Sequence, residues 1–283
     1  MKFDTASNAG LISRKNLFTK GRKVQVVTRL HCDVNFQKNL IPSNLDIGYI
    51  LTPSRQQFVI QSFAAEDKVF KIKIEDAQLC VRKVKLTPER VLSFEKEIAK
   101  NELKIPISNV KMQTYTLSAG IKSFDKNGFF TGKLPEMCVF GFLDNDSYTG
   151  SYATNPFNFK NFNLSQIQFR YNGRAVPTNP LQLDYEGGSV YDGYISLYTG
   201  LNRLYFDASN GLTLNDYKHG NSLYSINFNS NTSCSHDDIA GQGSIDISLK
   251  FNSGLPNAVT LVVYSAQDSA IIIDQFRNVI LES

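Results

Sequence analysis

The residues best able to do chemistry lie together in one short run, Cys234-Ser-His236-Asp237-Asp238. A metal site needs three or four such ligands at a suitable spacing, and His219 is the further candidate close by in sequence. The flanking residues are rich in Asn and Ser, which is typical of a polar surface loop. We therefore interpret the run as a surface loop and predict no metal site there.

Two other patterns are incomplete as reactive or binding motifs. Asp144-Asn145-Asp146 resembles the start of a calcium loop, but Thr149 and Asn155 stand where the loop needs Gly and Glu. Cys138 lies in an apolar strand pattern, which favours an inert core residue over a nucleophile. The chain has no GxSxG, HExxH or Gly-rich phosphate loop. The sequence therefore predicts no catalytic residue, no cofactor and no metal ligand, and we do not expect an enzyme.

A basic run is formed by Lys71, Lys73, Arg82, Lys83 and Lys85. It favours a solvated face, or a strand edge protected by charge, and contact with nucleic acid or an acidic partner is the alternative. The chain has 30 basic and 26 acidic residues, so its net charge of +4 does not indicate polyanion binding. No small-molecule substrate is expected.

Composition indicates a folded intracellular protein. The 283 residues are 42% apolar, enough for one large β domain or two smaller ones. No apolar run reaches the roughly 20 residues that span a bilayer, and the N-terminus lacks the apolar core of a signal peptide. We therefore expect no membrane span, no secretion and reduced thiols at the four cysteines, which form no CxxC pair: Cys32, Cys80, Cys138 and Cys234.

The clearest structural element is a β-hairpin. Residues 164–171 alternate between apolar and polar side chains, with Ile167, Phe169 and Tyr171 on one face. Asn172-Gly173 then supplies the two positive-φ residues of a type I′ turn. The loop before it carries Phe157, Phe159 and Phe162, which we interpret as aromatic anchors.

Alternation predicts strands over most of the remaining chain. Residues 24–36 and 45–51 are expected to form two antiparallel strands, and residues 69–86 a long extended stretch with changes of apolar phase. Cys32 and Cys80 would act there as small hydrophobes. Further strands are predicted at 108–117, 135–143, 164–171, 222–228, 244–251, 258–266 and 270–281.

Helices are few. Thr87-Pro88-Glu89 predicts the start of a helix over 88–100, with Val91, Phe94 and Ile98 as its buried stripe. Helical spacing predicts a second helix over 189–203. Many strands with few helices favour an all-β sandwich of jelly-roll type.

Short motifs run along nearly the whole chain. They are Arg29-Leu-His-Cys-Asp33, Leu79-Cys-Val-Arg-Lys-Val-Lys-Leu86, Leu134-Pro, Gly141-Phe-Leu-Asp-Asn-Asp146, Gly150 through Asn155-Pro-Phe-Asn-Phe-Lys160, Phe162-Asn-Leu164, Pro180-Leu-Gln182 with Asp184, Tyr194-Ile-Ser-Leu-Tyr-Thr-Gly200, and Asp274 with Arg277-Asn-Val-Ile280. In this order they resemble the major capsid protein of Polinton (Maverick) elements and adintoviruses.

The resemblance implies a fold, a domain division and a function. It implies an N-terminally shortened double jelly roll, with residues 1–56 as the last strands of the first roll, 57–68 as a linker and 69–283 as the complete second roll. It also implies a structural protein that self-assembles, as trimeric capsomers of an icosahedral shell, and that resides in the virion after an intracellular stage. An endogenous or truncated copy would carry the same motifs.

A second function class stays open on the residues alone. A jelly-roll module that binds carbohydrate or protein would use exposed aromatic side chains, for which Tyr148, Tyr152 and Tyr191 are the candidates. Exposed aromatics would favour this class, and self-association would favour a capsid-type protein.

Overall fold

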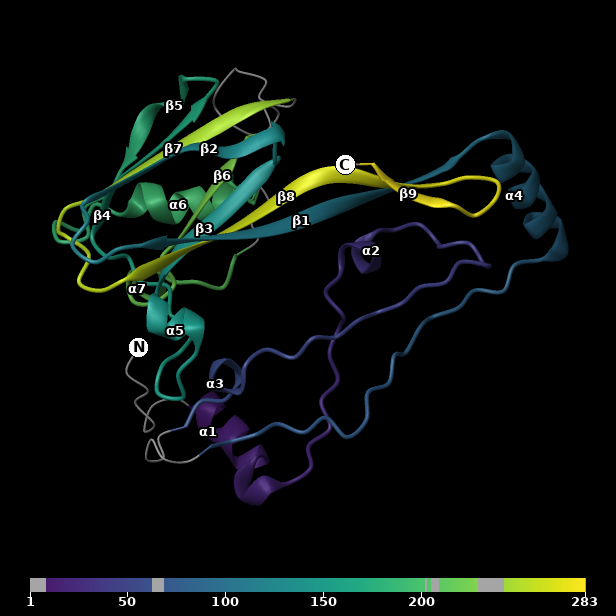
Figure 1. The fold of residues 1–283 in the computed structure, drawn as a ribbon, viewed down its shortest axis with the longest axis horizontal. Helices are drawn as coiled ribbons and strands as arrows, with labels where there is room; N and C mark the ends of the chain where they lie inside the picture. Colours follow the sequence, from purple (N-terminus) through teal and green to yellow (C-terminus); the bar gives the residue numbers. More distant parts are fainter. Residues whose placement is uncertain (1–8, 63–68, 202, 205–208, 229–241, 283) are drawn as a thin grey trace.

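The computed structural model describes residues 9–62, 69–201, 203–204, 209–228 and 242–282. All strands of this described part lie after residue 102, and two four-stranded layers of them form a sandwich at the left of Figure 1. The residues before 102 contain short helices joined by long extended stretches. The main core therefore lies in the part of the chain that follows residue 102.

Each sheet of the sandwich is antiparallel. The first contains β1 (Leu103–Leu117), β8 (Val259–Ile273), β3 (Met137–Asp144) and β6 (Leu223–Asn227) in that order, and β9 (Val279–Glu282) pairs with the far end of β8. The second contains β2 (Ser123–Lys133), β7 (Gln242–Phe251), β4 (Leu164–Tyr171) and β5 (Arg174–Gln182) in that order.

The pairing of these strands is that of a jelly roll. Strand β1 pairs with β8, β2 with β7, β3 with β6, and β4 with β5. Such nested pairing results when one long hairpin is rolled across two facing sheets. The predicted all-β jelly-roll sandwich with few helices is therefore confirmed.

The core lies between the two sheets because one face of each strand is apolar. In β7, Ile245, Ile247, Leu249 and Phe251 are buried, as their alternation predicted. Aromatic rings join the layers: Phe140 of β3 packs edge-on against Phe169 of β4, with ring centroids 6.0 Å apart. Three tyrosines that the sequence did not single out belong to this core or pack against it: Tyr185, Tyr217 and Tyr224.

The hydroxyl groups of these tyrosines satisfy one another inside the core. The hydroxyls of Tyr185 and Tyr224 lie 2.7 Å apart, and Tyr185 also donates to Tyr217 at 3.4 Å. Tyr217 and Tyr224 are fully buried, and burial is the largest cause that raises the pKa of both phenols well above the usual range. The three groups are therefore neutral and structural.

The predicted hairpin is confirmed. Asn172 and Gly173 have φ values of 46° and 83°, and Tyr171 pairs with Arg174 across the turn. Gln168, expected on the wet face, is instead buried next to a register shift between Ile167 and Phe169. Its amide nitrogen donates to the carbonyl oxygen of Pro177 at 3.0 Å, which satisfies the buried group.

Both predicted helices exist. Helix α4 (Pro88–Lys100) begins as expected, but the Thr87 side chain makes no capping hydrogen bond. Of its expected buried stripe only Ile98 is buried, since the helix lies at the far end of the molecule with little packed against it (Figure 1). Helix α6 (Tyr191–Thr199) is shorter than predicted. The later helices not predicted are α5 (Asn145–Thr149) and α7 (Leu214–Lys218).

The strands predicted at 24–36, 45–51 and 69–86 are wrong. These residues form no strand, and the first stretch ends in the short helix α2 (Asp33–Phe36). The other early helices are α1 (Ala9–Leu17), η1 (Thr19–Gly21) and α3 (Gln56–Val59). Alternation reports which residues suit a half-buried strand, but a strand also needs a neighbour, and no described residue supplies one here.

Strand β2 was missed because its sequence is poor in strand signal. It contains two glycines, two lysines and a β-bulge between Lys126 and Phe130. Strands β3, β4, β6 and β7 agree with the predicted ranges, whereas β1 begins earlier, at Leu103, β8 continues to Ile273 and β9 begins only at Val279. The C-terminal prediction at 270–281 therefore covers parts of two strands. Strand β5 had no predicted range beyond its place as the second strand of the hairpin.

Candidate assembly interface

The first sheet extends well beyond the sandwich. Strand β3 pairs with β8 only as far as Ala266, whereas β1 continues alongside β8 from Asn109 to Leu103. We call residues 103–109, 267–273 and 279–282 the sheet extension. It runs to the right in Figure 1 and ends near α4, where Arg277 forms a 2.6 Å ion pair with Glu95.

The sheet extension is apolar but incompletely covered. Ile105, Ile107 and Ile273 form a small second core, against which Leu45 packs. Phe276, Val279, Ile280 and Leu281, at and before β9, remain exposed. Among the described strands β9 pairs with β8 alone, so the other edge of this four-residue strand is open.

A long stretch of chain lies apart from both sheets. We call residues 22–62 and 69–86 the extended segment. It passes below the sheet extension in Figure 1, and its first part turns back beyond α2. Its apolar side chains are strongly exposed, with Val27 at 89% and Ile50 at 95%. Others are exposed by half or more: Val26, Leu51, Val69, Ile72, Ile74, Leu79, Val81 and Val84.

Two groups of contacts hold the extended segment to the sandwich. In the first, the Asp33 carboxylate accepts a 3.1 Å hydrogen bond from the Val110 backbone N–H on the open edge of β1. In the second, Phe70 packs edge-on against Tyr152 at 5.6 Å, and Ser62 N–H donates to the Tyr152 carbonyl at 2.9 Å. Away from these contacts, most apolar side chains of the segment face solvent.

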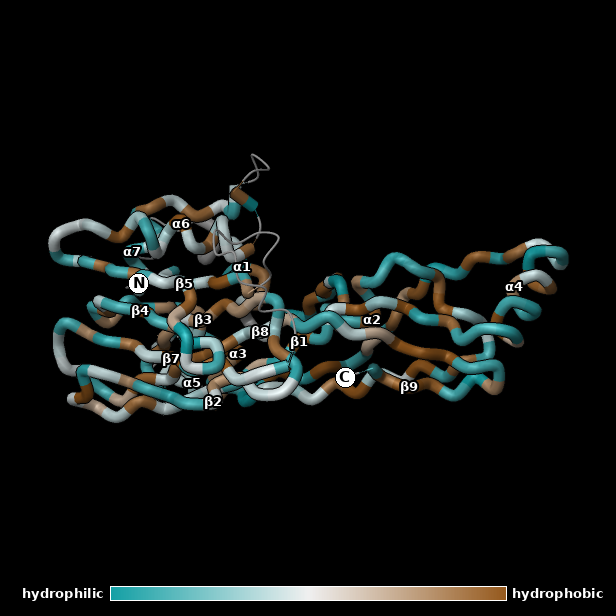
Figure 2. Tube along the Cα trace, turned by 90° about the horizontal axis from the view of Figure 1, so that it is seen from above, coloured by the Kyte–Doolittle hydropathy of each residue, from teal (hydrophilic) through white to brown (hydrophobic). Residues whose placement is uncertain are grey.

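Apolar residues recur along both the sheet extension and the extended segment, as the brown stretches in Figure 2 show. Transferring one fully exposed Val, Leu or Ile side chain from water into a core stabilises a protein by about 1.5–3 kcal/mol. Burial of the exposed apolar residues named above would therefore contribute at least as much free energy as the stability of a whole domain, usually about 5–15 kcal/mol. An uncovered apolar surface of this size is typical of an interaction surface.

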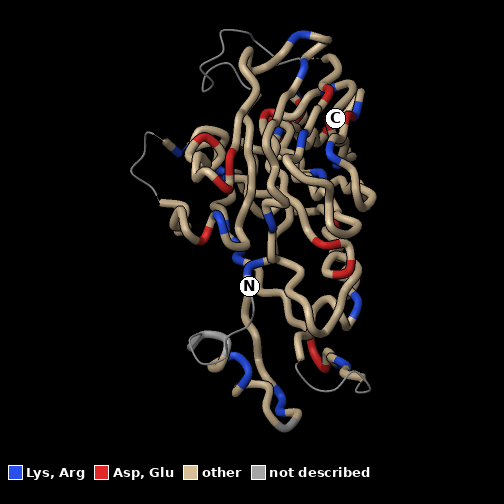
Figure 3. Tube along the Cα trace, turned by 90° about the vertical axis from the view of Figure 1, so that its left-hand side faces the viewer, with Lys and Arg blue, Asp and Glu red and all other residues tan. Residues whose placement is uncertain are grey.

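The basic run lies within the extended segment. Lys71, Lys73, Arg82, Lys83 and Lys85 are exposed and form no ion pair with a carboxylate of the described residues. An exposed 2.7 Å ion pair between Lys23 and Glu75 connects two parts of the segment. Along the trace in Figure 3, positions of Lys and Arg and positions of Asp and Glu both occur.

The described residues of the incomplete chemical motifs do not come together in a site. Cys234 to Asp238 lie outside the described residues, and the exposed His219 contacts the Asn215 carbonyl through Nδ1 at 2.9 Å. Asp144 forms an ion pair with Lys160 rather than facing Asp146 in a calcium loop. No group of three His, Cys, Asp or Glu side chains positioned to hold a metal occurs in the described part of the chain.

The described cysteines are free thiols. Cys138 is fully buried, and burial raises the pKa of its thiol well above the usual range, so it is protonated at neutral pH. Cys32 is half-buried. Cys80 is exposed, contrary to the expectation that it would pack as a small hydrophobe in a strand, because its stretch has no strand neighbour among the described residues.

The exposed aromatics do not form a single binding face. Tyr148 and Tyr191 are exposed, but they lie on different helices, α5 and α6. Tyr152 is part of the contact with Phe70 and is half-buried. Phe157, also exposed, packs edge-on against Phe58 of the extended segment at 6.0 Å.

One titratable pair lies where the sandwich meets the sheet extension. Partial burial, together with the hydrogen bond and negative charge of Asp268, raises the pKa of Glu136 to about 7. The Glu136 N–H donates to the Ala266 carbonyl at 2.9 Å, which places the pair beside β8. Sequence spacing gives no signal for this pair, since Glu136, just before β3, and Asp268 of β8 lie far apart along the chain.

Among the described residues, no helix has the length and apolar character needed to cross a membrane. No protein-family model matches the chain. The chain is 22% identical over 284 residues to "Uncharacterized protein F54H12.2" of Caenorhabditis elegans, a match that spans 99% of this chain and 67% of that protein.

Solved structures that are similar to this chain include viral capsid proteins. They are the PBCV-1 virus capsid (11% identity, TM-score 0.37, 62% of this chain and 50% of that chain), PBCV-1 VP54 fitted into the virophage Sputnik (11%, 0.39, 66% and 52%) and the mavirus major capsid protein (11%, 0.34, 64% and 41%). The chain thus spans about half of their length or less. The jelly-roll assignment itself comes from the strand pairing of the sandwich.

Proposed function

We propose that this chain is a non-enzymatic structural protein of a capsid-type shell, whose work is to bury surface between protein copies. The observation that carries the proposal is the pairing of a complete jelly roll with an extended segment whose apolar side chains are largely uncovered. A jelly roll on its own serves many functions. The uncovered apolar segment favours assembly among them.

The finer form of the proposal follows the sequence motifs. In this form the chain is of the Polinton or adintovirus type, associates as trimers and forms part of an icosahedral shell, with the virion as its location. Residues 1–56 would belong to a first jelly roll, 57–68 would be a linker, and 69–283 would contain the second roll. The sandwich strands begin at Leu103, so residues 69–100 would connect the two units.

The rival proposal is a jelly-roll module that binds carbohydrate or protein through exposed aromatics. It receives less support, because Tyr148 and Tyr191 stand on different helices and Tyr152 packs within the protein. Nucleic-acid contact through the basic run is a further part of the capsid proposal, with the exposed Lys71 and Lys85 as examples. These alternatives predict different binding partners and can be separated.

The test measures the mass of the full chain by size-exclusion chromatography with light scattering across a range of concentrations. We expect self-association that rises with concentration and is reduced in Ile50→Glu and Ile74→Glu, since both side chains are exposed in the extended segment. Tyr191→Glu is the matched control, because Tyr191 is exposed on α6 of the sandwich.

A chain that stays monomeric at the highest concentration, with residues 24–51 protected from hydrogen exchange, would contradict the proposal. A glycan-array signal that Tyr191→Ala abolishes, in a chain that does not self-associate, would instead support the rival module. Equal loss of association in all three Glu variants would indicate a general loss of solubility and no specific interface.

A further inference from the structure

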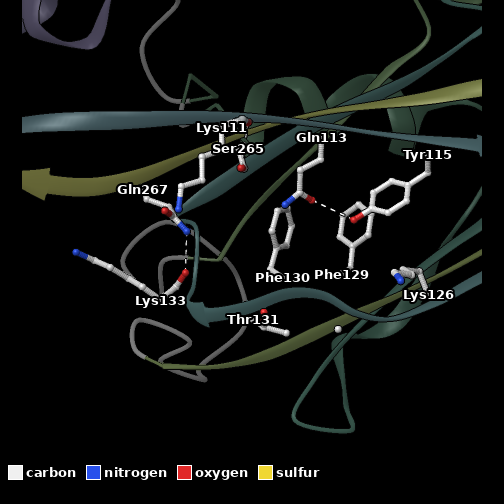
Figure 4. Close-up of a pocket in the computed structure, with 11 residues that line it drawn as sticks. Lys111, Gln113, Tyr115, Lys126, Phe129, Phe130, Thr131, Lys133, Ser265 and Gln267 are labelled. Atoms are coloured by element: carbon white, nitrogen blue, oxygen red, sulfur yellow. Dashed lines mark hydrogen bonds between the residues drawn. The ribbon is translucent and has the colours of Figure 1, made fainter. Parts of the chain in front are cut away.

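A cavity of about 290 Å³ lies between the two sheets, next to the point where β1 and β8 continue into the sheet extension (Figure 4). Its lining comes from β1, β2 and β8 and includes three lysines, Lys111, Lys126 and Lys133. None of its lining residues is acidic. The wall of this cavity therefore carries three positive charges and no negative one.

The inward face of β1 carries polar and charged residues between its apolar ends. Ile107, Lys111, Gln113 and Leu117 share the face of β1 that turns toward the interior, and only the first and last are apolar. Burying an unpaired charge is costly, so Lys111 stays exposed and the cavity stays open to solvent. An anion that enters the cavity would supply the missing pairing.

The described residues supply no such counter-charge. Lys111, Lys126 and Lys133 form no ion pair with a carboxylate of the described part of the chain. In Figure 4 the Lys111 side chain runs toward Gln267, Lys126 lies at the opposite end, and the Lys133 ammonium extends outward. Lys111 and Lys126 therefore lie at opposite ends of the cavity, and Lys133 lies at its rim.

Neutral donors in the cavity are held in place. Tyr115 donates to the Gln113 Oε1 atom at 3.1 Å, and the Gln113 amide nitrogen has no partner among the described residues. Gln267 donates from Nε2 to the Lys133 carbonyl at 2.7 Å, which fixes the backbone that carries this lysine. The cavity thus offers donors of two kinds, ammonium and amide.

A β-bulge shapes the floor of the cavity. The bulge between Lys126 and Phe130 allows the consecutive residues Phe129 and Phe130 both to be buried. Gly128 takes a φ of 60° there, and its N–H donates to Asp246 at 2.7 Å. The carboxylate that contacts the bulge is therefore already engaged with the backbone.

We propose that this cavity binds an oligophosphate group, meaning two or three linked phosphoryl units that together carry several negative charges. Lysine is a common phosphate ligand because its ammonium is a compact point charge. The cavity volume of about 290 Å³ is at the small end of the range for ligand pockets, which suits a small polyanion. The group can come from a free oligophosphate or from the 5′ end of a nucleic acid.

The test uses isothermal titration calorimetry of the full chain with sodium tripolyphosphate at fixed ionic strength. We expect saturable binding that becomes about tenfold weaker or more in the double variant Lys111→Gln/Lys126→Gln, because two charge-assisted hydrogen bonds are lost. Lys250→Gln is the matched control, since Lys250 is exposed on β7 and forms no ion pair within the described residues. If the double variant fails to fold, each single variant is measured instead.

A second arm compares a short oligonucleotide that carries a 5′-triphosphate with the same oligonucleotide carrying a 5′-hydroxyl. Tighter binding of the triphosphate form, lost in the double variant, identifies a nucleic-acid end as a source. Equal binding of the two forms leaves the free oligophosphate as the source. Absence of tripolyphosphate binding at millimolar concentration, or equal binding by wild type and double variant, overturns the proposal.

Discussion

Strand β7 and the stretch from Val69 to Glu75 carry almost the same pattern of alternating apolar and polar side chains. In β7 the apolar set, exemplified by Ile247, is buried between two neighbouring strands and the opposite sheet. In the other stretch Ile72 and Ile74 are exposed by half or more, and no strand forms. The difference is that β7 has a strand on each side, whereas the stretch from Val69 to Glu75 has no neighbouring strand among the described residues.

Alternation of apolar and polar side chains makes a segment suited to a strand, but the strand forms only when another strand pairs with it. A strand forms only if its backbone groups find hydrogen-bond partners and its apolar face finds a cover. The sandwich supplies both within one chain. The extended segment has the side chains of a strand but lacks the neighbour and the cover, which is the physical basis of the proposed assembly role.

The largest expected effect comes from removing a ring in the sandwich core. Phe142→Ala should lower the free energy of unfolding by about 3–5 kcal/mol, because Phe142 is fully buried among aromatic rings. Ile50→Ala in the extended segment should change it by about 0.5 kcal/mol or less. Urea unfolding of both variants makes the comparison, and equal losses would show that the segment is covered in solution.

The second effect tests the turn that fixes one hairpin of the sandwich. Gly173→Val should destabilise the protein by about 1–3 kcal/mol, because a β-branched residue at a φ of 83° is strained. A Cβ atom at this position would meet no other atom within 4 Å, so the cost arises from the backbone alone. Thermal unfolding is the measurement, and Gly173→Asn should cost less since Asn tolerates positive φ. An unchanged melting temperature in the Val variant would argue against the turn.

The third effect tests the contact between the extended segment and the sandwich. Asp33→Ala removes the acceptor of the Val110 N–H on the open edge of β1, a bond worth about 1 kcal/mol. Hydrogen exchange at Val110 should accelerate, while exchange at Ile247 in the sandwich should stay the same. Asp46→Ala is the control, since Asp46 is an exposed acid of the same segment. A change at Ile247 would mean that the two regions unfold together.

The smallest effect is a pH dependence of stability that comes from Glu136, where the sandwich meets the sheet extension. The pKa of Glu136 is raised to about 7 in the folded protein, above its value of about 4.3 in the unfolded chain. Between these two values the folded state binds more protons, so stability falls as pH rises and stays reduced above pH 7. Glu136→Gln should therefore stabilise the protein by about 1 kcal/mol or less at about pH 8, with little effect at about pH 4. Urea unfolding at both values is the measurement, and an equal effect at both would contradict the interpretation.

Local sequence determined the parts of this protein that depend on near neighbours. The Asn172-Gly173 turn, the start of α4 at Pro88 and the inward face of β7 all follow from short-range rules. Strand β2, in contrast, could not be found this way, because its Gly-rich bulge hides the alternation. Short-range rules therefore predicted the turn and the strands with regular alternation. They failed for β2, where a bulge interrupts the two-residue alternation of apolar and polar side chains.

The tertiary structure alone decided which alternating stretches became strands. It paired β1 with β8, which lie far apart along the chain, and it left the apolar stretches at 24–36 and 69–86 without a strand neighbour among the described residues. It also brought Lys111 of β1 and Lys126 of β2 around one cavity and placed Glu136 against Asp268. No local rule contains these facts, because strand pairing joins residues that are distant in sequence and depends on every other strand that competes for the same edge.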